Sequence, residues 1–147
     1  MIRALALACG MAAAACAPAG PETISPGLYG NVRLSEESGD LGGMELELIG
    51  SGPGAHVEFV FCEGWCNSSH KAPVELTDGG FKFYYTEQYS YADGSPARAR
   101  VEVQAIRTAD GIRVTVKPTD DSYEPFSSDL PRISERFGLE VAAAAEK

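Results

Sequence analysis

Hydrophobic and polar residues alternate along most of the chain between Pro26 and Pro118. In each of five segments an apolar side chain occupies every second position: Met44, Leu46 and Leu48; Val57, Phe59 and Phe61; Phe81, Phe83 and Tyr85; Val101, Val103 and Ala105; and Ile112, Val114 and Val116. A period of two is typical of a strand with one buried face. The segments are rich in β-branched and aromatic residues and too short for typical helices. The pattern therefore predicts strands.

Short glycine-containing turns connect these segments. Residues 109–111 and 77–80 contain Asp and Gly, which tolerate the positive φ of tight hairpins, and 50–54 and 92–96 are similar turns. Further strands are expected at 27–34 and near 74–76. Short turns between successive strands give an antiparallel meander. We therefore predict an all-β domain over 27–117, with about seven to eight strands forming a small barrel or a sandwich.

The C-terminal part, 118–147, lacks this alternation. A polar loop is expected at 118–127, followed by a helix that opens at Leu130-Pro131, because a capping side chain precedes them and proline suits the first turn. Apolar side chains recur at helical spacing as far as Phe137, and Gly138 ends the run. Residues 138–145 are expected to form a last strand or a further helical turn. One short C-terminal helix packed on the β domain is thus predicted.

The start of the domain has a distant likeness to a known group of barrels. Gly27-Leu28-Tyr29 stands where lipocalins and calycins often have Gly-x-Trp, and a meander and then a helix follow it. The chain resembles that group in topology. The resemblance implies a small calycin-like barrel and assigns no ligand-binding residue.

The first sixteen residues have the composition of an export signal. Arg3 is their only charge, an apolar run covers 4–15, and small residues precede Cys16. This pattern predicts a signal peptide over 1–15 and an oxidising, exported location. The run is shorter than the ~20 apolar residues of a membrane-spanning helix.

Cys16 gives the signal a more specific interpretation. Ala14 and Ala15 before it, and the Pro/Gly-containing tether over 16–26 after it, resemble the lipobox and linker of bacterial lipoproteins. The resemblance implies lipidation at Cys16 and attachment to a membrane of the bacterial cell envelope. Ala17 is not the Asp of an inner-membrane retention signal, which favours the outer membrane, facing the periplasm. The alternative is an ordinary signal peptide with Cys16 incidental.

The charge of the mature chain is strongly negative. Removal of 1–15 takes away one of the 12 basic residues, Arg3, and none of the 21 acidic ones, so the net charge falls from −9 to −10. An acidic surface argues against nucleic acid as a partner and against electrostatic docking on anionic lipids. Membrane attachment is therefore expected through the lipid alone.

Two cysteines and a histidine form one local cluster. Cys62 and Cys66 flank Gly64, which allows the chain to turn, and His70 follows four residues later. In an exported protein this spacing favours a structural disulfide. The alternatives are a metal site formed by Cys62, Cys66 and His70, and a redox-active cysteine pair. No metal or other cofactor is expected.

The remaining candidates concern binding and catalysis. Tyr84, Tyr89 and Tyr91 belong to an aromatic-rich hairpin and are candidates for a recognition surface, because tyrosine combines contact area with a polar group. The sequence has no serine elbow, no phosphate-binding glycine loop and no HExxH motif, and only two histidines. We expect no enzymatic activity.

Three functional hypotheses follow from these features. The favoured one is an exported, lipid-anchored lipoprotein whose non-catalytic β domain binds a protein partner or forms part of an assembly. The second is a calycin-like carrier of a small apolar ligand, which requires a cavity inside the barrel. The third is a metal-binding or thiol-redox protein that uses the Cys62–His70 loop.

Overall fold

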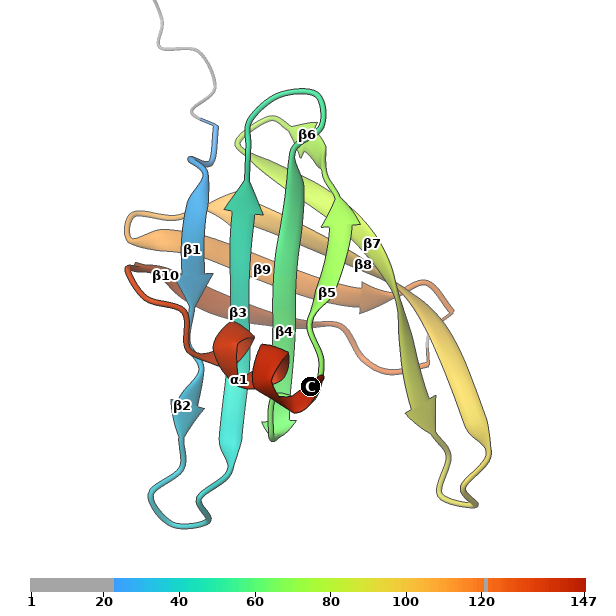
Figure 1. Ribbon diagram of the computed structural model, residues 1–147. Coiled ribbons are helices and arrows are strands. Elements are labelled where there is room, and N and C mark those ends of the chain that lie inside the picture. The colour runs from blue at the N-terminus through green and yellow to red at the C-terminus, as the bar shows by residue number, and fades with distance from the viewer. Residues whose placement is uncertain (1–22, 121) are drawn as a thin grey trace, which may run out of the picture.

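A computed structural model describes residues 23–120 and 122–147 of this protein (Figure 1). This part of the chain contains ten strands and one helix: β1 (Gly27–Gly30), β2 (Arg33–Leu34), β3 (Leu41–Ile49), β4 (His56–Gly64), β5 (His70–Pro73), β6 (Glu75–Thr77), β7 (Gly80–Ser90), β8 (Pro96–Arg107), β9 (Gly111–Pro118), β10 (Phe126–Ile133) and α1 (Gly138–Ala145). The predicted signal peptide, Cys16 and the start of the tether lie outside the described residues. No helix among the described residues is long and apolar enough to cross a membrane.

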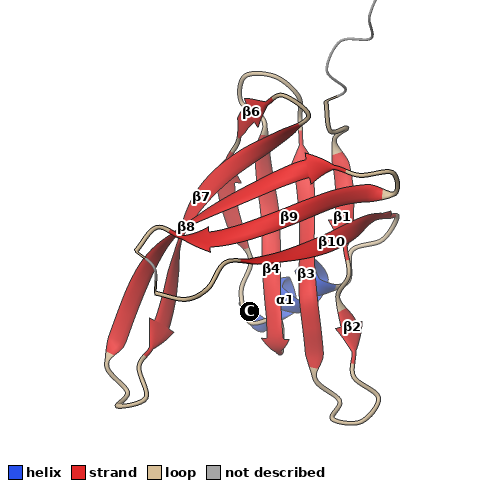
Figure 2. Cartoon of the chain, turned by 180° about the vertical axis from the view of Figure 1, so that it is seen from behind, coloured by secondary structure: helices blue, strands red, loops and turns tan. Residues whose placement is uncertain are grey.

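All strand pairs are antiparallel and form one strongly bent sheet. Its order is β5-β4-β3-β1-β10-β9-β8-β7-β6, with β2 attached to β3. Strands β8, β9 and β10 cross β1, β3 and β4 at a steep angle, as Figure 2 shows from behind. Strand β5 lies against β7, so the two ends of the sheet approach one another. The sheet is a nearly closed barrel, which confirms the predicted all-β fold with one short C-terminal helix.

The predicted alternation matches the interior of this barrel. Met44, Leu46 and Leu48 of β3 and their counterparts on β4, β7, β8 and β9 face inward. Phe59, Phe81, Phe83, Val101, Val103, Ile112 and Val114 are all 0 % exposed. The centre of the barrel is therefore filled by side chains.

A second apolar cluster lies outside the barrel, beneath α1. Leu139 and Ala142 of the helix pack on Val60 and on the two cysteines, which occupy outward positions of β4 and the loop after it. Gly138 permits this close approach, because a Cβ atom there would lie 3.0 Å from Val32 and 3.1 Å from Val60. Strands β3 and β4 are thus covered on both faces.

A buried carboxylate holds the start of α1. Glu45 of β3 is 1 % exposed and accepts hydrogen bonds from the backbone N–H groups of Gly138 at 2.9 Å and Leu139 at 3.3 Å. It also accepts one from the N–H of Phe137. The first N–H groups of a helix need such acceptors, and the side chain of Phe137 at the N-cap position provides none. Glu45 therefore caps the helix from a strand distant in sequence.

The helix predicted from Leu130 is wrong in position. Residues 126–133 form β10, Leu130 pairs with Ile112 and its side chain is fully buried in the core. Pro131 lies where β10 leaves β9 to pair with β1, so a missing N–H is tolerated there. The helix lies at Gly138–Ala145 instead, and the β domain extends beyond residue 117 to Ile133.

The predicted first strand over 27–34 is interrupted. Strands β1 and β2 are separated at Asn31, whose side chain accepts a hydrogen bond from the N–H of Met44 at 2.9 Å and donates one to the Ser128 hydroxyl at 2.8 Å. Gly43 leaves room for it, because a Cβ atom there would lie 2.7 Å from Asn31 Oδ1. Strand β5 was not predicted, because His70–Pro73 shows no alternation of its own.

Candidate functional site

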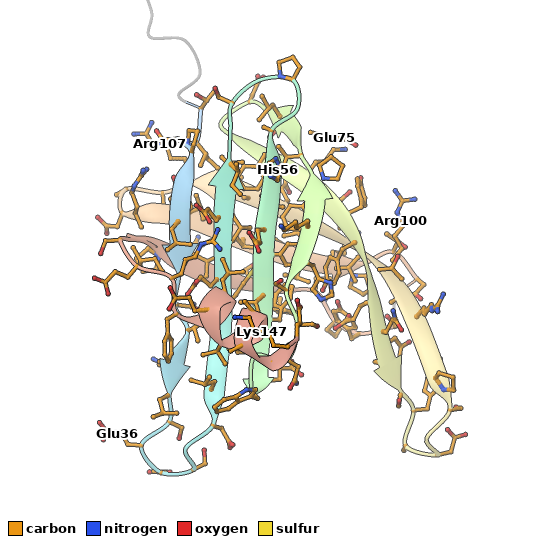
Figure 3. All side chains as sticks on the ribbon, in the orientation of Figure 1. Glu36, His56, Glu75, Arg100, Arg107 and Lys147 are labelled. Carbon is orange, nitrogen blue, oxygen red and sulfur yellow. A yellow bond between two sulfur atoms is a disulfide. The ribbon has the colours of Figure 1, made fainter. Side chains whose placement is uncertain are left out.

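The β7–β8 hairpin projects beyond the barrel and carries different side chains on its two faces. On the outer face the Arg100 guanidinium lies 4.6 Å from the centre of the Tyr84 ring, and the Tyr84 hydroxyl donates to Glu102 at 2.5 Å. Arg100 points away from the barrel in Figure 3. Arg98 occupies the next outward position of β8, opposite Gln88. The projecting part of the hairpin thus places Arg98 and Arg100 outside.

On the inner face of the same hairpin, β7 carries aromatic and acidic side chains, whereas β8 carries small ones. Tyr85, Glu87 and Tyr89 of β7 follow the buried Phe81 and Phe83 on the same face. In the register of the pair, Glu87 lies opposite Ala99 and Tyr89 opposite Ala97. Large side chains on β7 therefore stand beside alanines on β8.

Aromatic rings line the place where the two ends of the sheet approach one another. The Tyr85 ring lies 5.0 Å from Phe59, 5.9 Å from Phe61 and 5.6 Å from the His70 imidazole, measured between ring centres. His70 also lies 5.4 Å from Phe59. Strand β5 contributes only the imidazole to this cluster. Ring contacts here replace the strand pairing that a closed barrel would have.

Glu87 and Tyr123 complete this end of the barrel. Burial, followed by the negative charge of Glu87, raises the pKa of Tyr85 well above its ordinary value. The same two causes, in the same order, raise the pKa of Tyr123. The charge of Glu63 acts on both tyrosines in the same direction. One oxygen of Glu87, Oε2, is buried and has no hydrogen-bond partner among the described residues.

We call this region the barrel mouth and define it as Phe61, His70, Tyr85, Glu87, Tyr89 and Tyr123. Tyr89 is held at its edge by edge-to-face contact with Tyr91, at 5.6 Å between ring centres. The members come from β4, β5, β7 and the β9–β10 loop. The mouth is hence assembled only in the folded chain.

The three predicted binding tyrosines do not share one surface. Tyr84 lies on the outer face of the hairpin, whereas Tyr89 lies on the inner face, because their positions differ by an odd number along β7. Tyr91, at the hairpin tip, is 58 % exposed and contacts Tyr89. The structure therefore brings together Tyr89 and Tyr91 and leaves Tyr84 in an ion-paired cluster of its own.

The cysteine pair and His70 lie on opposite sides of the sheet. Cys62 and Cys66 are bonded to each other, and both pack beneath α1 in the outer cluster. The imidazole of His70 faces the barrel mouth. Among residues 23–120 and 122–147, no group of three or more His, Cys, Asp or Glu side chains is arranged to hold a metal ion. The structure thus contains the predicted disulfide and does not assemble the alternative metal site.

Loss of this disulfide is expected to destabilise the domain moderately. Replacing Cys62 and Cys66 together with alanine should lower the free energy of unfolding by about 2 kcal/mol, because the closed loop is short. Urea unfolding of both proteins measures the difference. Dithiothreitol should destabilise the wild type by a similar amount and leave the double variant unchanged. An equal response of the two proteins to reductant would contradict the prediction.

Sequence reasoning missed the acidic and buried members of the mouth. Glu87 lies an even number of positions after Phe83 and Tyr85, so the alternation of side chains along β7 already places it on the inward face. Tyr123 carries no comparable signal, since it lies in a loop that only the tertiary fold brings against β7. A similar signal exists for Glu45, because Val60 and Cys62 are apolar at outward positions of the neighbouring strand.

No protein-family model, no curated protein and no solved structure matches this chain. The properties of the mouth therefore rest on its own geometry.

Proposed function

We propose that the protein is an exported, lipid-anchored lipoprotein of the bacterial cell envelope whose β domain is a non-catalytic binding or assembly module. The export signal over 1–15 and the lipobox-like residues before Cys16 support the anchor. Ala17 favours the outer membrane, with the domain in the periplasm. The proposal needs no cofactor and no nucleic acid.

The relative position of the two ends of the barrel carries this proposal. Strand β1 begins at one end, whereas the projecting β7–β8 hairpin and the β2–β3 hairpin both point toward the opposite end (Figure 1). A chain held at Cys16 would enter the barrel through β1. The mouth and Tyr91 would then face away from the anchored end, where a partner has access to them.

The packing of the interior favours a surface binder over a carrier of a small apolar ligand. A carrier needs an internal cavity of several hundred Å³. The large inward side chains here, including Phe59, Phe81 and Phe83, are 0 % exposed and in contact with one another. The mouth offers tyrosines instead, which are enriched where proteins contact one another.

Cys16→Ala should release the protein from the membrane. We expect the full-length wild-type chain, expressed in a bacterium with a lipoprotein-processing pathway, to fractionate with membranes, because a diacylated N-terminus anchors it. The variant should appear in the soluble periplasmic fraction. Mass spectrometry of the mature N-terminus should show a diacyl group on Cys16 of the wild type. A soluble wild type whose N-terminus carries no lipid would overturn the anchor.

A further inference from the structure

We propose that the barrel mouth binds a lysine or arginine side chain presented by an exposed segment of a protein partner. The inference rests on the proposed function as a binding module and names the chemistry of the partner. It stands on three observations about the mouth.

The first observation is the unpartnered oxygen of Glu87. Its Oε2 atom is buried and accepts no hydrogen bond from the described residues, although a carboxylate oxygen normally has a partner when it is buried. A guanidinium or ammonium group carries only donors. Because Oε2 is covered, the side chains around it must move for such a group to reach it, and the group would then supply the missing hydrogen bond together with the opposite charge.

The second observation is the arrangement of rings around that carboxylate. Tyr85 and Tyr123 lie close enough to Glu87 for its charge to act on both, and Tyr89 follows Glu87 on the same face. Aromatic faces attract cations. The hairpin already contains such a contact on its outer face, where Arg100 lies over Tyr84. The inner face also has tyrosine rings beside a carboxylate, but β8 carries alanines at the facing positions instead of an arginine.

The third observation is the distribution of charge around the mouth. Glu63 acts on Tyr85 and Tyr123, and Asp120 acts on Tyr89, so the region is negative beyond Glu87 itself. The lysine and arginine side chains nearby either pair with other carboxylates or point away from the mouth. Lys82 pairs with Glu75 at 3.1 Å, Lys71 lies 3.9 Å from Glu58, and Arg98 and Arg100 of β8 are on its outer face. The whole chain carries a net charge of −9. The surrounding charge thus attracts a cation to the mouth.

The test uses the purified full-length protein and a defined probe. The probe is an acetylated and amidated Gly-Arg-Gly-Arg-Gly peptide, and its control carries citrulline, which has the shape of arginine without the charge. Binding is followed by NMR of the tyrosine rings and backbone amides at low salt. We expect saturable shifts at Tyr85, Tyr89 and Tyr123 with the arginine peptide, and at least about tenfold weaker binding of the citrulline peptide.

Two variants with the same change of charge locate the site. Glu87→Gln should weaken binding of the arginine peptide at least about tenfold, whereas Glu102→Gln, on the outer face of the same hairpin, should change it less than about twofold. Tyr89→Leu should weaken binding as well, because it removes a ring and leaves the charge. Equal affinity for the two peptides, or equal effects of the two glutamine variants, would overturn the proposal. Spermidine binding as tightly as the peptide would overturn its assignment to a protein partner.

A separate measurement distinguishes this inference from the proposed function. Cross-linking in isolated envelopes, from a photoreactive residue introduced at Tyr91, reports any bound protein. If the Glu87→Gln variant still cross-links to a partner protein at unchanged yield, the proposed cation site in the mouth is overturned. The same result would support the proposed binding function. Absence of any cross-linked protein, while the arginine peptide still binds, would count against the binding module.

Discussion

Replacing Glu45 with alanine is expected to lower the free energy of unfolding by about 3 kcal/mol. The carboxylate accepts hydrogen bonds from three successive backbone N–H groups at the start of α1, and those of Gly138 and Leu139 are buried. A buried donor left without an acceptor costs about 1–3 kcal/mol, and the helix also loses a negative charge at its positive end. Urea unfolding followed by circular dichroism measures the loss.

Glu47→Ala is the matched control, because Glu47 lies on the same face of β3 two residues away. It pairs with Arg136 at the surface, and its side chain is 27 % exposed. A surface ion pair contributes about 0–1 kcal/mol. The structure therefore predicts a small loss for Glu47→Ala. Similar losses for the two variants would show that Glu45 acts only as one more surface charge.

The Glu45 variant should also loosen α1 before the barrel unfolds. The helix is eight residues long and has little stability of its own. Without its cap, the amides of 138–142 should exchange hydrogen faster than the interior amides of β8 and β9. Unchanged protection of α1 would mean that the packing of Leu139 and Ala142 alone keeps the helix in place.

Gly111→Ala is the second substitution with a large expected effect. A Cβ atom at this position would overlap the carbonyl oxygen of Leu130 and lie 2.8 Å from the Cα of Pro131. Both contacts are with backbone, so no side chain can move aside. Overpacking of this kind costs about 3 kcal/mol, because β9 and β10 must separate where β10 turns toward β1. Thermal and urea unfolding should both show the loss.

Gly42→Ala provides the comparison within another strand. A Cβ atom there meets no atom within 4 Å, so the added methyl group has space. Its effect should be neutral or slightly stabilising, since alanine restricts the unfolded chain. Equal destabilisation by the two alanines would indicate a general cost of replacing glycine in this sheet, and would contradict the specific overlap at Gly111.

The alternation of apolar residues predicts most of the barrel, because inward and outward positions of a strand differ in every second residue. It fails at β10 for a physical reason. Leu130 is buried in the barrel interior, whereas Ile133, three positions later and therefore on the opposite face of the strand, is half-buried in the outer cluster beneath α1. Because both faces are covered here, apolar residues occur at the three-residue spacing that is typical of a helix. The pairing partners that decide between strand and helix are distant in sequence.

The candidate site was less accessible to sequence reasoning. Tyrosines are frequent in this hairpin, but Tyr84 and Tyr89 are assigned to opposite faces only because β7 continues as a regular strand to Ser90. Tyr123 joins the mouth through the tertiary fold. Glu45 alternates with the inward side chains of β3 and is nevertheless buried, because α1 covers the outer face of that strand.

The pairing of β1 with β10 sets a condition on when this protein folds. Leu28 lies opposite Ile133, so the first and last strands are neighbours in the sheet although more than one hundred positions separate them. Until residues 126–133 are available, no strand pairing among the described residues joins the two halves of the sheet. Contacts of such sequence separation form slowly. Under the export that we propose, a chain that crosses a membrane with its N-terminus first would stay without its completed barrel until nearly all of it has crossed, and such a delay is compatible with export in the unfolded state.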